Sequence, residues 1–104
     1  MKKVFGLVLI FLIISSFCFG NMNLIEIFLA GRQAYDEGNY VLASIAFKMV
    51  YAFYPDNEVI NYWLGKTYEK LNEPVWANYY FNRAEKLNPN EPKYKHRAKS
   101  IITF

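Results

Sequence analysis

The sequence predicts an all-α protein, a short α-solenoid of two antiparallel helix-turn-helix repeats plus a capping helix. Apolar residues recur at helical rather than alternating spacing along most of the chain. Proline, glycine and asparagine residues interrupt this spacing at regular intervals. A period of 34 residues carries Gly31, Ala43, Phe47 and Pro55 onto Gly65, Ala77, Phe81 and Pro89. Such a period is typical of helical hairpins that stack on one another.

The first repeat is predicted over residues 24–57. Apolar residues at helical spacing predict a helix from Leu24 to Asp36, and Gly38 is expected to turn the chain. Asn39 is expected to cap a second helix over residues 40–54, because its side chain can accept a hydrogen bond from the first helical turn. Pro55 ends this helix, since proline lacks the backbone N–H that a helix needs.

The second repeat is predicted over residues 58–91 and begins with a helix over residues 58–71. Asp56 or Asn57 precedes this helix, and either residue can act as its N-cap. The order of helix, short turn and second helix is then the same as in the first repeat.

The last two predicted helices follow a second turn. Asn72 is expected to cap the fourth helix, which holds Pro74 in its first turn and ends at about Leu87. A fifth helix over residues 92–102 is expected to cap the stack.

These residues together resemble the tetratricopeptide repeat family. The second repeat is the closer match, because it contains Leu64-Gly65-x-x-Tyr68 and Ala77-x-x-x-Phe81 followed by Ala84 and Pro89. The first repeat keeps Gly31, Gly38, Tyr40, Ala43, Phe47 and Pro55. The resemblance departs where a large aromatic residue is expected early in the first helix of each repeat, at Ile27 and Asn61, and where Ala34 takes the place of Tyr68. It implies a tetratricopeptide-like domain over residues 21–104.

The predicted core relies on packing alone, because Cys18 is the only cysteine and no internal disulfide can form. Glycine and alanine at the repeated positions allow two helix backbones to approach closely, and the repeated phenylalanines fill the space between helix pairs. The expected aromatic members of the core are Tyr35, Phe47, Phe53, Trp63, Tyr68 and Phe81.

Residues 1–20 have the pattern of an export signal. Lys2 and Lys3 precede an apolar run, and small residues at Cys18 and Gly20 suit cleavage after Gly20. The mature chain would then be exported through the secretory route, to the periplasm or cell envelope in a bacterium. Two alternatives remain: residues 4–20 stay attached as an anchor helix, or Cys18 is lipidated.

Most of the net charge of +3 comes from this N-terminal segment. Without Lys2 and Lys3, ten lysines and arginines face nine aspartates and glutamates. A nearly neutral domain argues against nucleic acid as a partner. Membrane contact is expected only if residues 4–20 are retained or Cys18 carries a lipid.

The resemblance implies that the first helices of the repeats line a concave groove for a protein or peptide partner. Arg32 and Lys66 are separated by one period, so two cations would lie side by side on the groove floor. Cations flanked by aromatic rings suit a carboxylate or an acidic segment, although solvated side chains at the edge of the core would give the same pattern. The concave set is Phe28, Arg32, Tyr35, Tyr62, Lys66, Glu69 and Lys70.

The second helix of the first repeat has few polar residues, only Ser44 and Lys48 being clearly so. An apolar stripe therefore remains outside the core and continues into the second repeat. This convex set consists of Leu42, Ile45, Met49, Trp76 and Tyr79, and it predicts a docking surface or a homodimer. The alternative is that the N-terminal segment folds over it.

Catalysis and cofactor binding find little support in the sequence. His96 is the only histidine, and glycine-rich phosphate loops are absent from the sequence. Lysines and Arg97 around His96 form a basic cluster that suits the solvated face of a capping helix. The sequence therefore predicts a non-enzymatic adaptor with no cofactor and no metal site. A membrane-tethered structural subunit of an envelope complex is the alternative.

Overall fold

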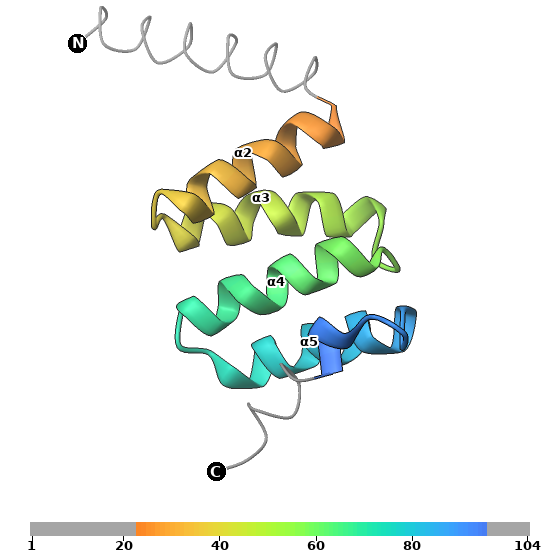
Figure 1. Cartoon of the computed structure of the whole chain (residues 1–104). Coiled ribbons are helices and arrows are strands. Elements are labelled where there is room, and N and C mark those ends of the chain that lie inside the picture. Colours follow the sequence, from red (N-terminus) through yellow and green to blue (C-terminus); the bar gives the residue numbers. More distant parts are fainter. Residues whose placement is uncertain (1–22, 96–104) are drawn as a thin grey trace, which may run out of the picture.

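The computed structural model describes residues 23–95, which fold into two stacked helical hairpins (Figure 1). The first hairpin pairs α2 with α3 and the second pairs α4 with α5, and the packing of α4 against α3 joins them. The described residues contain no strand, so the predicted all-α class is confirmed. The four helices of residues 23–88 are α2 (Leu24–Asp36), α3 (Tyr40–Phe53), α4 (Glu58–Lys70) and α5 (Pro74–Leu87).

Asparagine side chains start three of the four helices. Asn23 and Asn57, one period apart, accept hydrogen bonds from the first turns of α2 and α4. Asn39 accepts one from the backbone N–H of Leu42 at the start of α3. Each bond satisfies a backbone donor that has no partner within the helix. The predicted Asn39 cap is confirmed, and Asn57 rather than Asp56 caps α4.

Both hairpins use the same turn, which corrects the role predicted for Asn72. Gly38 has a φ of 82° and Asn72, one period later, has a φ of 59°, so both lie in the left-handed region. Asn72 is therefore the turning residue, and Glu73 occupies the N-cap position of α5 without a side-chain hydrogen bond. Asparagine can replace glycine here because its short polar side chain tolerates this conformation better than most.

The repeated glycines lie directly against the repeated phenylalanine rings. A Cβ atom on Gly31 would come within 2.7 Å of the Phe47 ring, and one on Gly65 within 2.6 Å of the Phe81 ring. Phe47, Phe81, Ala43 and Ala77 are fully buried. The expected close approach of the helices is thus present in both hairpins.

A polar network ties the loop between the hairpins to α5. The amide of Asn61, fully buried, donates to the carbonyl oxygens of Pro55 (2.9 Å) and Asn57 (2.8 Å). Arg83 of α5 donates to Asn61 Oδ1, to the Pro55 carbonyl and to Asp56. Asn61 stands where the tetratricopeptide pattern has a large aromatic residue. Its side chain therefore holds the loop by hydrogen bonds instead of making an apolar contact.

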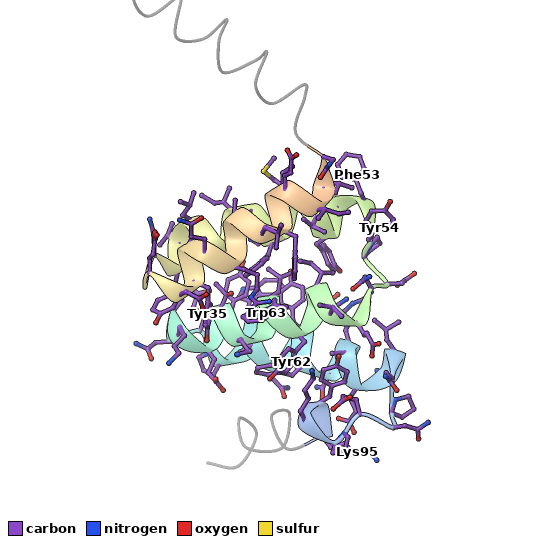
Figure 2. The ribbon with its side chains drawn as sticks, turned by 45° about the horizontal axis from the view of Figure 1, so that its top comes forward. Tyr35, Phe53, Tyr54, Tyr62, Trp63 and Lys95 are labelled. Carbon is purple, nitrogen blue, oxygen red and sulfur yellow. The ribbon has the colours of Figure 1, made fainter. Side chains whose placement is uncertain are left out.

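The aromatic core differs from the prediction at Phe53, which is 69% exposed. Phe53 is the last residue of α3, and Figure 2 shows it at the end of the first hairpin, before the loop that leads to α4. Tyr68 and Phe81 are buried, and Tyr35 and Trp63 are half-buried against the core. The prediction of Phe53 as a core residue is wrong, because at the end of α3 its side chain is left largely in solvent.

The helical start of the predicted cap lies within the described residues. Residues 92–95 are helical, and Tyr94 is 3% exposed. Tyr94 lies one period after the buried Ile60, so it takes the place that Ile60 has in the second hairpin.

Three predictions lie outside the described residues. These are the export signal over residues 1–20, the lipidation of Cys18, and the rest of the cap with its basic cluster around His96. Within residues 23–95, none of the helices is long and apolar enough to cross a bilayer.

Candidate functional site

Trp63 forms the centre of an aromatic cluster between α2 and α4. Tyr35 lies edge-on to Trp63 with ring centroids 5.4 Å apart, and Phe47 lies 5.9 Å away beneath it. Tyr62 flanks the indole ring at 6.3 Å. Figure 2 shows Tyr35, Trp63 and Tyr62 along one side of the two hairpins. Tyr35 and Tyr62 belong to the predicted concave set, whereas Trp63 is predicted only as a core residue.

Two cationic side chains lie against this indole ring. The Arg32 guanidinium carbon is 4.2 Å from the centroid of Trp63, and the Lys66 ammonium nitrogen is 4.4 Å from it. Lys66 also lies 5.3 Å from the Tyr35 ring and 5.6 Å from the Tyr62 ring. The negative face of an aromatic ring attracts cations, so these rings hold both charges in place. The predicted pairing of Arg32 with Lys66 is present, with Trp63 as its common support.

Arg32 keeps part of its hydrogen-bonding capacity unused among the described residues. Its Nε atom is buried without a hydrogen-bond partner there. A guanidinium group that stacks on an aromatic ring still has donors at its edge for a carboxylate. The site can therefore accept an anionic group over the indole ring.

A third cation extends this row toward the cap. The Lys93 ammonium nitrogen lies 5.0 Å from the Tyr62 ring, and Tyr94 packs on Tyr62 with centroids 5.2 Å apart. Lys93 belongs to the basic cluster around His96, which is predicted to form a solvated face. Lys93 and Tyr62 are 31 residues apart, and no motif in the sequence connects them. The only indication is the repeat, in which the neighbouring Tyr94 corresponds to the buried Ile60.

The other predicted concave residues are Phe28, Glu69 and Lys70. Phe28 packs on Phe47 with centroids 5.7 Å apart and is half-buried. Glu69 and Lys70 belong to the last turn of α4, where Lys70 is exposed. We therefore define the cationic cluster as Arg32, Tyr35, Tyr62, Trp63, Lys66 and Lys93.

An apolar groove of about 220 Å³ lies at the opposite ends of the same helices. It is bounded by the start of α2, the end of α3 and the start of α4. Phe28 faces this groove rather than the cationic cluster. Its lining consists of Leu24, Ile25, Phe28, Val50, Tyr54, Asn57, Val59 and Ile60.

The predicted convex residues are exposed with one exception. Leu42 and Ile45 on α3 and Trp76 and Tyr79 on α5 are all between 44% and 52% exposed. Met49 is only half-buried and packs against the core instead. Beneath this face, Tyr68 and Tyr80 stack with ring planes 7° apart.

Buried tyrosines make the stability of the fold sensitive to alkaline pH. Burial, followed by the nearby Tyr68, raises the pKa of Tyr80 to about 12. Burial and then the Glu58 carboxylate raise the pKa of Tyr94 to about 12 as well. A phenol whose pKa rises on folding stabilises the fold fully below the unfolded pKa of about 10, and this contribution is lost as pH rises from there toward 12.

We therefore expect the free energy of unfolding to fall as pH rises above about 10. Urea denaturation on either side of this pH measures the loss, and Tyr80→Phe reduces its slope because one linked proton is removed. A stability that stays constant to about pH 12 would contradict these pKa shifts.

Comparison with known proteins adds no assignment. The chain matches no protein-family model and no curated protein. Within residues 23–95, histidine, cysteine, aspartate and glutamate side chains form no group of three that could hold a metal ion.

Proposed function

We propose that this chain is an exported, non-enzymatic adaptor of the tetratricopeptide type that binds an acidic peptide segment of a partner protein. The observation that carries this proposal is the arrangement of Arg32 and Lys66 around Trp63. The repeated glycine, alanine, phenylalanine and proline positions and the two equivalent hairpins support the tetratricopeptide assignment.

The chemistry of the cluster favours an acidic segment over other partners. Stacking on aromatic rings fixes the two cations, so a carboxylate can bind them at a small cost in side-chain entropy. Tyr35 and Tyr62 offer flat, amphipathic surfaces beside the charges, which suit an aromatic or apolar side chain next to the carboxylate. Lys93 would add a further contact at the cap end of the face.

The charge of the bound peptide provides the test. A displayed library of random short peptides should yield acidic sequences with the unchanged protein, and Arg32→Glu together with Lys66→Glu should reverse this preference. Each lost charge-assisted hydrogen bond is worth about 1.5–3 kcal/mol, so the double change should weaken binding of a selected acidic peptide at least a hundredfold. Trp63 fluorescence in a Trp76→Phe background reports the binding.

A matched control changes two cations of the second helices. Lys48→Glu with Lys86→Glu alters the net charge by the same amount, and both lysines are exposed on α3 and α5. Peptide selection should be unchanged in this variant. Equal loss of binding in both double variants would show that only net charge matters and would refute the site.

A membrane-tethered structural subunit is the second candidate. The apolar run of the N-terminal segment reaches Gly20, and α2 begins four residues later at Leu24, beside the apolar groove. If residues 4–20 are retained, this groove lies next to the bilayer. The intact mass of the protein from its native envelope decides between the two, because cleavage after Gly20 leaves Asn21 as the first residue.

A further inference from the structure

The exposed apolar residues of the second helices obey the 34-residue period. Position by position, α3 and α5 present large apolar side chains to solvent at the same places, and all of them are at least 39% exposed. Buried residues must repeat if a fold repeats, but exposed ones need not. The repeated exposed pairs are Val41 and Val75, Leu42 and Trp76, Ile45 and Tyr79, and Phe53 and Leu87.

Most of these residues gather at one edge of the molecule. α3 and α5 both start from the edge that holds the two hairpin turns and run in the same direction (Figure 1). The first three pairs therefore lie together near the starts of the two helices. We call these six residues, Val41, Leu42, Ile45, Val75, Trp76 and Tyr79, the apolar stripe.

Polar residues do little to interrupt the stripe. Ser44 is buried and donates its hydroxyl to the Val41 carbonyl oxygen at 2.7 Å. Lys48 is the one charged residue of α3, and it lies a full turn beyond Ile45 with its ammonium nitrogen 5.4 Å from the Tyr68 ring. Exposure of such an apolar surface to water is unfavourable in free energy.

Along α3, the charges around the stripe have opposite signs at its two ends. Asp36 and Glu37 precede the helix, and the exposed Lys48 lies further along it. On α5 the charges balance, because Lys70 accompanies Glu73 and Glu85 accompanies Lys86. A copy of the same surface laid antiparallel would place acidic turns over lysines, whereas a parallel copy would place like charges together.

We propose that a second copy of this chain covers the apolar stripe. The two copies pack antiparallel about a two-fold axis that crosses α3 between Leu42 and Ile45, and α5 between Trp76 and Tyr79. In this arrangement Ile45 of each copy contacts Leu42 of the other, and Tyr79 contacts Trp76. Lys48 then lies over the acidic Asp36–Glu37 turn of the other copy. Such a self-complementary patch is what two-fold symmetry requires.

This dimer leaves the cationic cluster open. The cluster lies on α2, α4 and the helical residues 92–95, and the stripe lies on α3 and α5. The two proposals are therefore independent, and a dimer would present two peptide sites facing outward. Arg32→Glu with Lys66→Glu should leave the dimer intact.

Sedimentation equilibrium of the full chain, purified in the form that an exporting host leaves, tests the proposal. The unchanged chain should dimerise between micromolar and millimolar concentration. Ile45→Lys should raise the dimer dissociation constant at least tenfold, because it buries a charge without a partner. Ile25→Lys is the matched control. Ile25 is 70% exposed, more than Ile45 at 52%, and lies on α2 away from the stripe. This change should therefore leave the dimer dissociation constant unchanged.

Disulfide trapping tests the orientation. In a Cys18→Ser background, a mixture of Ile45→Cys and Leu42→Cys chains should form the mixed disulfide, and a mixture of Ile45→Cys and Tyr79→Cys should not. A monomer at every concentration, or a dimer that Ile45→Lys leaves unchanged, would overturn the proposal. So would the reverse disulfide pattern. Vesicle binding that Ile45→Lys abolishes in a monomeric chain would instead make a bilayer the occupant.

Discussion

Gly65→Ala is expected to lower the free energy of unfolding by about 1–3 kcal/mol, the usual effect of adding atoms to a filled core. The new Cβ atom would lie 2.6 Å from two carbons of the Phe81 ring and 2.9 Å from a third. Phe81 is fully buried, so its ring cannot swing into solvent to make room. Because a domain of this size has a thin margin of stability, such a loss should shift its denaturation midpoint clearly.

A double variant separates this clash from a general effect of glycine replacement. Phe81→Leu alone removes ring atoms and leaves space, so Gly65→Ala combined with Phe81→Leu should cost less than the sum of the two single changes. Gly31→Ala should behave like Gly65→Ala, because its Cβ would meet the Phe47 ring at 2.7 Å. Urea denaturation monitored by circular dichroism measures all four variants. Strict additivity would mean that the ring and the glycine do not compete for space.

The repeat was predictable because its residues act locally. Asn39 and Gly38 impose a cap and a left-handed turn on their own neighbours, so their roles follow from residue type and position. Asn72 was misassigned because asparagine suits both an N-cap and a left-handed turn. Alignment with Gly38, one period earlier, was the signal that could have decided between them.

The candidate site was only partly predictable, because it depends on the angle between two hairpins. Periodicity placed Arg32 and Lys66 at equivalent positions, but it could not show that both charges stack on Trp63. Trp63 corresponds to Leu29, which is 57% exposed in the first hairpin, so the repeat gave no hint of a shared aromatic support. Contacts between repeats depend on packing over many residues, which a single sequence does not specify.

Asn61→Ile is expected to lower the free energy of unfolding by about 2–4 kcal/mol, although the first repeat has isoleucine at the same position, as Ile27. The isoleucine side chain would fill a similar volume but would remove the amide hydrogen bonds to the Pro55 and Asn57 carbonyl oxygens. Pro55 would keep only the Arg83 donor, and Asn57 only the backbone N–H of residue 61. The change would also remove the Asn61 Oδ1 atom, which accepts the Arg83 Nε–H bond at 3.1 Å. A neutral hydrogen bond contributes about 0.5–1.5 kcal/mol, and one from a charged donor such as Arg83 about 1.5–3 kcal/mol.

Asp56→Asn is the control for this prediction, because it weakens the only ion pair of Arg83 in the described residues and keeps the buried amide. The Asp56 side chain is 82% exposed, and exposed pairs contribute at most about 1 kcal/mol. If the ion pair held the loop, Asp56→Asn would be the more harmful change. If the amide holds it, Asn61→Ile alone should destabilise the chain, increase amide hydrogen exchange at Asp56 and Asn57 and weaken acidic-peptide binding. That last effect follows because the network of Asn61 and Arg83 fixes the loop into α4, the helix that carries Trp63 and Lys66 toward Arg32.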